Sequence, residues 1–160
     1  MFKKLRILKD AYDQGVLDSL ADNAYLMTVI LISLIYQHKN LSKDKSEKLF
    51  NNIIEILYEY NPDFKKLEIP LNDISDIYLS YTPQLLQDVC DSYKDVYTPG
   101  GESYTVLKSE YKLNEIQILN MKQEYKNQIT SNLEKLYLLN SEIITESYFT
   151  NHLNKIFSML

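Results

Sequence analysis

An uncharged apolar stretch near the start of the chain, from Ala24 to Tyr36, constrains the fold more than any other feature. Its thirteen residues include no charged residue, no glycine and no proline. At ~1.5 Å per residue it would extend roughly 20 Å as a helix, short of the ~30 Å hydrocarbon core of a bilayer. A segment that is apolar on every side is typical of a helix enclosed by other helices. The stretch therefore predicts a buried helix over residues 24–36 and no membrane-spanning segment.

A buried strand is the alternative for this stretch, because Val29, Ile30 and Ile32 are β-branched and suit a pleated sheet. Length favours the helix, since buried strands usually run ~4–8 residues and helices more than ~10. The whole chain has only three glycines. A β-rich fold of this size would need many tight turns with positive φ, for which glycine is the usual residue. An all-α fold is the prediction.

Apolar residues recur at spacings of three and four along most of the remaining chain, which is the pattern of one helical face. Ser42 and Thr82 are predicted N-caps, because their hydroxyls can accept hydrogen bonds from free backbone N–H groups. Pro83 suits the first helical position, and the residues at 98–101, Thr-Pro-Gly-Gly, form the strongest break in the chain. The helices predicted before this break cover residues 2–20, 24–36, 43–61, 73–80 and 83–97, with Asn72 capping the fourth.

The apolar stripe continues after the break and predicts one long helix from Ser103, as its cap, to Asn140. Its length of about 35 residues exceeds the usual ~8–20. Two forms stay open: a kink near residues 130–132 that gives a helical hairpin, or a straight rod that packs on a partner or on a second copy. Ser141 is predicted to cap a closing helix.

These elements predict a bundle of about six helices around the buried helix at 24–36. At this length the chain is expected to form a single domain over residues 1–160. A sub-division into residues 1–97, as the bundle, and 103–160, as the long helix with its closing helix, is left open.

The charge of the chain is distributed unevenly. The formal net charge is −5, and residues 51–100 hold nine acidic side chains against three basic ones. The negative electrostatic field of these residues repels phosphates and attracts basic protein surfaces. Only one arginine, the commonest base-reading residue, occurs in the sequence. Direct binding to nucleic acid is therefore disfavoured.

Residues of the types that usually form catalytic or metal sites are few and far apart in the sequence. Cys90 is the only cysteine, which excludes an internal disulfide and a multi-cysteine zinc site. Its neighbours Asp88 and Asp91 would raise its pKa, so an inert thiol is expected. His38 and His152 lie far apart and lack metal-ligand spacing. No phosphate-binding loop or nucleophile elbow is present. We expect no enzymatic activity, no cofactor and no metal, and, without a signal-peptide core near the N-terminus, a cytoplasmic location.

Three carboxylates, Asp88, Asp91 and Asp95, are spaced by three and four residues and so share one face of the predicted helix. Asp73 and Asp76 lie just upstream. Such a cluster can be a solvated helix face, a docking surface for a basic partner, or a pair of catalytic or cation-binding carboxylates. The docking surface is the functional hypothesis, and the solvated face is the structural alternative.

Tyrosine is unusually frequent, with fourteen residues and no tryptophan. Four of the tyrosines lie among the aspartates of residues 73–97, and tyrosine is common where a protein surface binds a partner. The alternative is that tyrosine replaces phenylalanine in the core and keeps its hydroxyl at the edge. The candidate partner-binding residues are Asp73, Asp76, Tyr78, Tyr81, Asp88, Asp91, Tyr93, Asp95 and Tyr97.

Together these features favour a non-enzymatic protein that binds another protein with a basic surface. The specific hypothesis is a small acidic inhibitor or immunity-type protein, for instance one encoded by a phage or mobile element, that acts on a nucleic-acid-binding enzyme such as a nuclease. The alternative is a structural or assembly protein that forms a homodimer through its long C-terminal helix, with Leu107, Ile118 and Met121 at the contact. An enzyme with an unrecognised carboxylate site is the third hypothesis.

Overall fold

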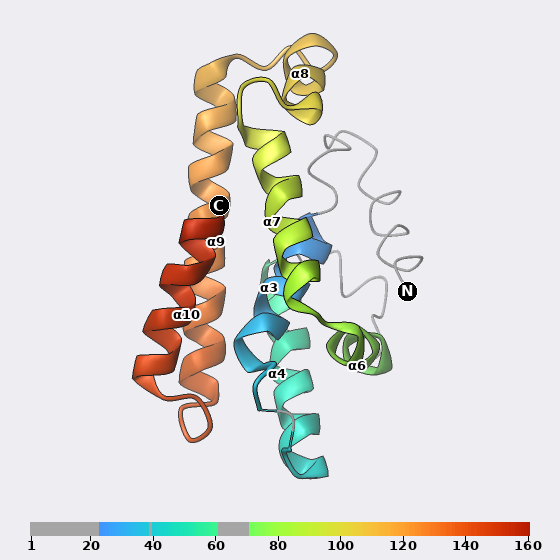
Figure 1. The fold of residues 1–160 in the computed structure, drawn as a ribbon, viewed down its shortest axis with the longest axis vertical. Coiled ribbons are helices and arrows are strands. Elements are labelled where there is room, and N and C mark those ends of the chain that lie inside the picture. Colours follow the sequence, from blue (N-terminus) through green and yellow to red (C-terminus); the bar gives the residue numbers. More distant parts are fainter. Residues whose placement is uncertain (1–22, 39, 61–70) are drawn as a thin grey trace.

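The prediction of an all-α helical bundle is confirmed. The computed structural model describes residues 23–38, 40–60 and 71–160, and these residues form seven α-helices and no strand (Figure 1). The helix predicted over residues 2–20 lies outside the described ranges. The helices are α3 (Asn23–Ile35), α4 (Lys43–Tyr60), α6 (Leu71–Ser80), α7 (Pro83–Tyr97), α8 (Glu102–Ser109), α9 (Glu115–Leu139) and α10 (Glu146–Met159).

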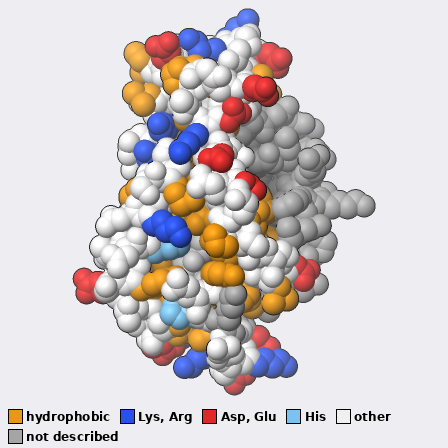
Figure 2. Space-filling model, viewed as in Figure 1, with side chains coloured by type: hydrophobic (Ala, Val, Ile, Leu, Met, Phe, Trp, Pro, Cys, Tyr) orange, Lys and Arg blue, Asp and Glu red, His pale blue; other side chains and the backbone are white. Residues whose placement is uncertain are grey.

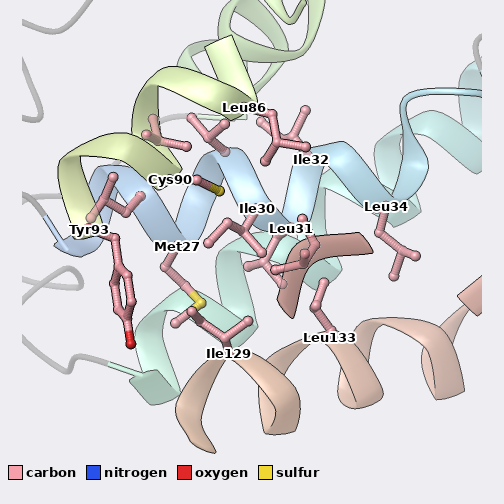
Figure 3. Close-up of a cluster of buried hydrophobic side chains, with 14 of the residues drawn as sticks. Met27, Ile30, Leu31, Ile32, Leu34, Leu86, Cys90, Tyr93, Ile129 and Leu133 are labelled. Atoms are coloured by element: carbon pink, nitrogen blue, oxygen red, sulfur yellow. The ribbon is translucent and has the colours of Figure 1, made fainter. Parts of the chain in front are cut away.

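The apolar stretch forms α3, which lies at the centre of the bundle. All its side chains from Leu26 to Ile35 are buried, including the polar Thr28 and Ser33. α3 packs against α4, α6, α7, α9 and α10. Figure 3 shows it between α7 on one side and α9 on the other. Burying one aliphatic side chain contributes ~1.5–3 kcal/mol, so this helix supplies much of the driving force for folding.

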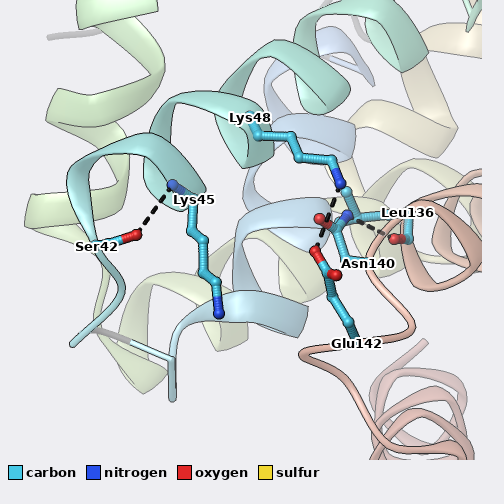
Figure 4. Close-up of polar contacts among 6 residues, drawn as sticks. All are labelled: Ser42, Lys45, Lys48, Leu136, Asn140 and Glu142. Carbon is cyan, nitrogen blue, oxygen red and sulfur yellow. Dashed lines mark hydrogen bonds and ion pairs between the residues drawn. The ribbon is translucent and has the colours of Figure 1, made fainter.

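Side-chain caps begin α4 and α7 where the sequence places them. The Ser42 hydroxyl accepts a hydrogen bond from the Lys45 backbone N–H at 3.3 Å (Figure 4). The Thr82 hydroxyl accepts one from the Leu85 N–H at 3.1 Å, and Pro83 is the first residue of α7. Each cap satisfies one N–H that has no partner within its helix.

The predicted cap at Asn72 is wrong, because α6 begins one residue earlier and Asn72 lies within it. The predicted cap at Ser103 is also wrong: α8 begins at Glu102 after Gly101, and Ser103 lies in its first turn. For the last helix, Thr145 replaces the predicted Ser141, and its hydroxyl accepts a hydrogen bond from the Tyr148 N–H at 3.2 Å.

The long helix predicted from residue 103 to residue 140 is broken at residues 110–114. Lys112 has a φ of 58°, a left-handed conformation that a continuous helix cannot contain. Asn114 then begins α9 with a capping box: its side chain accepts from the Gln117 N–H at 2.8 Å, and the Gln117 side chain accepts from the Asn114 N–H at 2.9 Å. α9 continues through residues 130–132, where a kink was one of the two expected forms.

The turn between α9 and α10 makes one polar contact to the end of α9 and one to α4. Asn140 is buried, and its side-chain amide donates to the Leu136 carbonyl at 2.8 Å, which satisfies a free carbonyl at the end of α9 (Figure 4). Lys48 of α4 forms an ion pair with Glu142 at 3.5 Å. Both charged side chains are more than half exposed, so this ion pair contributes little stability.

Candidate partner-binding surface

Helix α7 separates its acidic residues from its apolar ones. Asp88 and Asp91 are exposed, while the opposite face of the helix lies in the core. The 3.6-residue period produces this division, because apolar residues occupy the positions between the aspartates. The buried residues of α7 are Leu86, Val89, Cys90, Tyr93, Val96 and Tyr97.

Three of the four candidate tyrosines are core residues. Tyr81, Tyr93 and Tyr97 are 7%, 1% and 5% exposed. The Tyr93 hydroxyl donates to the Lys122 carbonyl at 3.1 Å, and its ring stacks on Tyr125 with ring centroids 5.4 Å apart. At these three positions tyrosine therefore serves as a core residue in place of phenylalanine, as the alternative interpretation of the sequence expected. They are not available to anchor a partner.

The candidates on α6 are separated from those on α7. Asp76 is exposed, and Tyr78 is half-buried with its ring edge-to-face against Phe50 at 5.5 Å. Asp73 belongs to α6, but its side chain lies outside the described part of the structure. α6 packs against α3 and α4, whereas α7 packs against α8, α3, α9 and α10. The two groups of acidic residues thus sit on elements with largely different neighbours.

A continuous acidic ridge runs from α7 onto α8 and consists of Asp88, Asp91, Asp95 and Glu102. The first three are one helical turn apart on one face of α7. The Asp95 carboxylate accepts a hydrogen bond from the Glu102 N–H at 2.9 Å, which places the backbone of the exposed Glu102 beside the end of the row. Figure 2 shows acidic side chains along this line over α7 and α8. Sequence reasoning missed Glu102, because it follows the Pro-Gly-Gly break and only tertiary contact brings it to α7.

Asp88 and Asp91 form no ion pair with a basic side chain in the described ranges. Asp88 accepts a hydrogen bond from the Gln84 side chain at 2.8 Å, and Asp91 accepts one from the Gln87 side chain at 2.9 Å. Both donors are neutral and lie one turn earlier on the same helix. These bonds orient the carboxylates and leave their charge uncompensated.

Asp95 has a structural function, because it caps α8 from a neighbouring helix. Its two oxygens accept from the backbone N–H groups of Glu102 and Ser103 at 2.9 and 3.2 Å. A hydrogen bond with the Ser103 side chain is the main cause that lowers the pKa of Asp95, and the backbone bonds add to it. Gly101 is needed at this contact, since a Cβ there would lie 2.1 Å from the Asp95 carbonyl oxygen.

The chemistry available elsewhere in the described residues is limited. Burial, followed by the nearby Asp91, raises the pKa of the Cys90 thiol to about 11, so it is not a thiolate at neutral pH. Among residues 23–38, 40–60 and 71–160, no three His, Cys, Asp or Glu side chains are grouped so that they could hold a metal ion. No helix in these ranges has both the length and the hydropathy needed to cross a bilayer.

A buried Ser33–His152 pair joins α3 to α10. The Ser33 hydroxyl donates to the Ile30 carbonyl at 2.6 Å, so the His152 Nε2–H donates to Ser33 Oγ at 2.9 Å. Burial is the main cause that lowers the pKa of His152 to about 4, and Lys155 lowers it further. With Ser33 3% and His152 8% exposed, a substrate has no access, and the pair is structural.

Comparison of the chain with protein-family models, with curated proteins and with solved structures finds no match.

The cap on α8 leads to a first prediction. Asp95→Ala is expected to lower the free energy of unfolding by about 1 kcal/mol, the usual effect of losing an N-cap acceptor. Asp88→Ala and Asp91→Ala, which remove only exposed carboxylates, should change it by less than about 0.5 kcal/mol. Urea denaturation of the three variants measures the difference. Equal stabilities of Asp95→Ala and Asp91→Ala would show that the cap contributes nothing.

The buried histidine leads to a second prediction. The unfolded chain takes up a proton at His152 near pH 6.5, whereas the folded chain keeps this ring neutral down to about pH 4. Since the unfolded state binds more protons in this window, stability should fall as the pH is lowered from 6.5 to 4. At about 1.4 kcal/mol per pKa unit, the loss is on the order of 3 kcal/mol.

The matched variant for this test is His152→Gln, whose amide can still donate to Ser33 but does not titrate. Urea denaturation at several pH values between 7.5 and 4 should give a shallower pH dependence for the variant than for the wild type. If both proteins lose the same stability over this range, the titration of His152 is not responsible.

Proposed function

We propose that the protein acts by binding another protein, and that the acidic ridge on α7 and α8 is the binding surface. The observation that supports this most is the pair Asp88 and Asp91, which are exposed, one helical turn apart, and without a basic partner in the described ranges. Charge of one sign on a surface steers an oppositely charged partner and fixes its orientation.

The proposed partner is a basic protein, and a nucleic-acid-binding enzyme such as a nuclease is the specific candidate. A row of carboxylates on a helix can occupy a groove that normally holds phosphates. In this proposal the protein is a non-enzymatic, cytoplasmic inhibitor or immunity-type protein, for instance one encoded by a phage or mobile element. Because Tyr81, Tyr93 and Tyr97 are buried, recognition rests on charge rather than on aromatic anchors.

Charge reversal on the ridge tests this proposal. Tagged wild type and the double variant Asp88→Lys/Asp91→Lys are used to capture proteins from a lysate of the source organism. The control is Glu55→Lys/Glu134→Lys, which changes the net charge equally at exposed positions on α4 and α9. We expect the wild type and the control to capture one basic partner, and the ridge variant to lose it by about tenfold or more.

The same interaction should weaken as salt is raised, because the Debye length falls from ≈ 10 Å at 0.1 M to ≈ 3 Å at 1 M. A partner captured equally by the ridge variant would contradict the proposal. A partner with an acidic binding surface would contradict it as well.

Self-association is the second candidate, and it is favoured by exposed apolar residues at the start of α9. Ile116 and Leu119 are 70% and 62% exposed and lie three residues apart on one side of the helix. The expected dimer contact at Leu107 and Ile118 needs correction, because these side chains are 0% and 1% exposed and belong to the core of one chain. A contact between two copies would have to use Ile116 and Leu119 instead.

Sedimentation velocity over a wide concentration range tests this candidate. If it holds, the wild type forms a concentration-dependent dimer that Ile116→Glu/Leu119→Glu abolishes. The control Leu79→Glu, at a position 80% exposed on α6, should leave the dimer intact. A wild type that stays monomeric at all concentrations would rule out self-association.

A further inference from the structure

Helix α10 is held to the bundle by few buried side chains. Its buried residues are Phe149, His152 and Ile156, whereas α4, α7 and α9 each bury five or six. Figure 1 shows α10 on the outside of the bundle, beside α9. One of the three side chains that dock this helix is therefore ionisable, and histidine is the residue whose ordinary titration lies closest to neutral pH.

The contact between His152 and α3 favours a neutral ring. The His152 Nε2–H donates to Ser33 Oγ at 2.9 Å, so an added proton binds at Nδ1. Protonation leaves the bond to Ser33 in place, but it puts a full positive charge on a ring that is 8% exposed. Burying a charge without an opposite charge beside it is unfavourable, so the docked form of α10 resists protonation.

The groups around His152 do not compensate such a charge. The titratable side chains at this contact are Tyr36 and His38 after α3, Tyr81 before α7, Tyr137 on α9, and Tyr148 and Lys155 on α10. No carboxylate of the described residues belongs to this set. Burial is the main cause that lowers the pKa of His152 to about 4, and the positive charge of Lys155 lowers it further.

The bundle can lose the contact with α10 more easily than its contacts with the other helices. The side of α3 that faces α10 carries the polar Ser33, while α4, α6, α7 and α9 cover α3 elsewhere. Elements that bury few apolar side chains commonly open before the whole protein unfolds. A local opening of α10 therefore costs less than an opening of α4, α7 or α9.

We propose that α10 is a pH-sensitive element, which undocks from α3 when His152 takes up a proton while the rest of the bundle stays folded. In the released helix water solvates the charged ring, so the ring regains its ordinary pKa of 6.5. The released form then binds more protons than the docked form between about pH 6.5 and 4, and acid favours release in this window.

Release changes the surface of the protein. Phe149 and Ile156, which are 9% and 0% exposed in the docked helix, become open to solvent and to other apolar surfaces. This device goes beyond the proposed binding at the acidic ridge and does not depend on it, because the ridge lies on α7 and α8.

Hydrogen exchange of the full chain, followed for each backbone amide by NMR at pH 7.5 and 5.0, tests the proposal. Each rate is divided by the intrinsic rate of that amide at the same pH, which leaves a protection factor that measures opening. With a pKa of about 4 in the docked helix and 6.5 in the released one, protection in α10 should fall about 30-fold over this range. Protection in α3 should exceed that in α10 at both pH values.

Three variants assign the effect to one side chain. In His152→Gln, whose amide can donate to Ser33 but does not titrate, protection in α10 should fall less than about threefold. Lys155→Glu, at an exposed position, places a carboxylate near the ring and should at least halve the fall. The control His38→Gln removes the other histidine, which lies outside α10, and should keep a fall of about tenfold or more.

Two results would overturn the proposal. Equal protection of α3 and α10 at pH 5.0 would show that the bundle opens only as a whole. A fall in α10 protection that is the same in the wild type and in Lys155→Glu would show that other groups cause the pH dependence, even if His152→Gln did not fold.

Discussion

Burial of α3 on every side is the constraint on which the rest of the structure depends. A helix without a polar face is stable in water only when neighbours cover its whole circumference, and α4, α6, α7, α9 and α10 provide this cover. Each neighbour must then turn its own apolar face inward. For α7 this places Leu86 and Tyr93 in the core and leaves Asp88 and Asp91 in solvent. The exposure of Asp88 and Asp91 is thus a geometric consequence of burying α3.

The features that could be predicted from the sequence are those set by residues close together in the chain. Thr82-Pro83 marks the start of α7 because the cap and the proline act within one turn of it. The cap of α8 could not be found in this way, because its acceptor comes from Asp95 on another helix. The burial of Tyr93 and Tyr97 was predictable, since both lie at helical spacing from Leu86 and so share the apolar face of α7.

The contact between Ser33 and His152 has a consequence for the synthesis of the protein. The two residues are 119 positions apart, so the ribosome makes α3 long before it makes α10. At about 5–20 residues per second, the interval is on the order of 6–24 seconds. During this time α3, the most apolar of the described helices, lacks part of its cover, because α9 also emerges late. Hydrophobic surface that is exposed in this way makes an unfinished chain prone to aggregation.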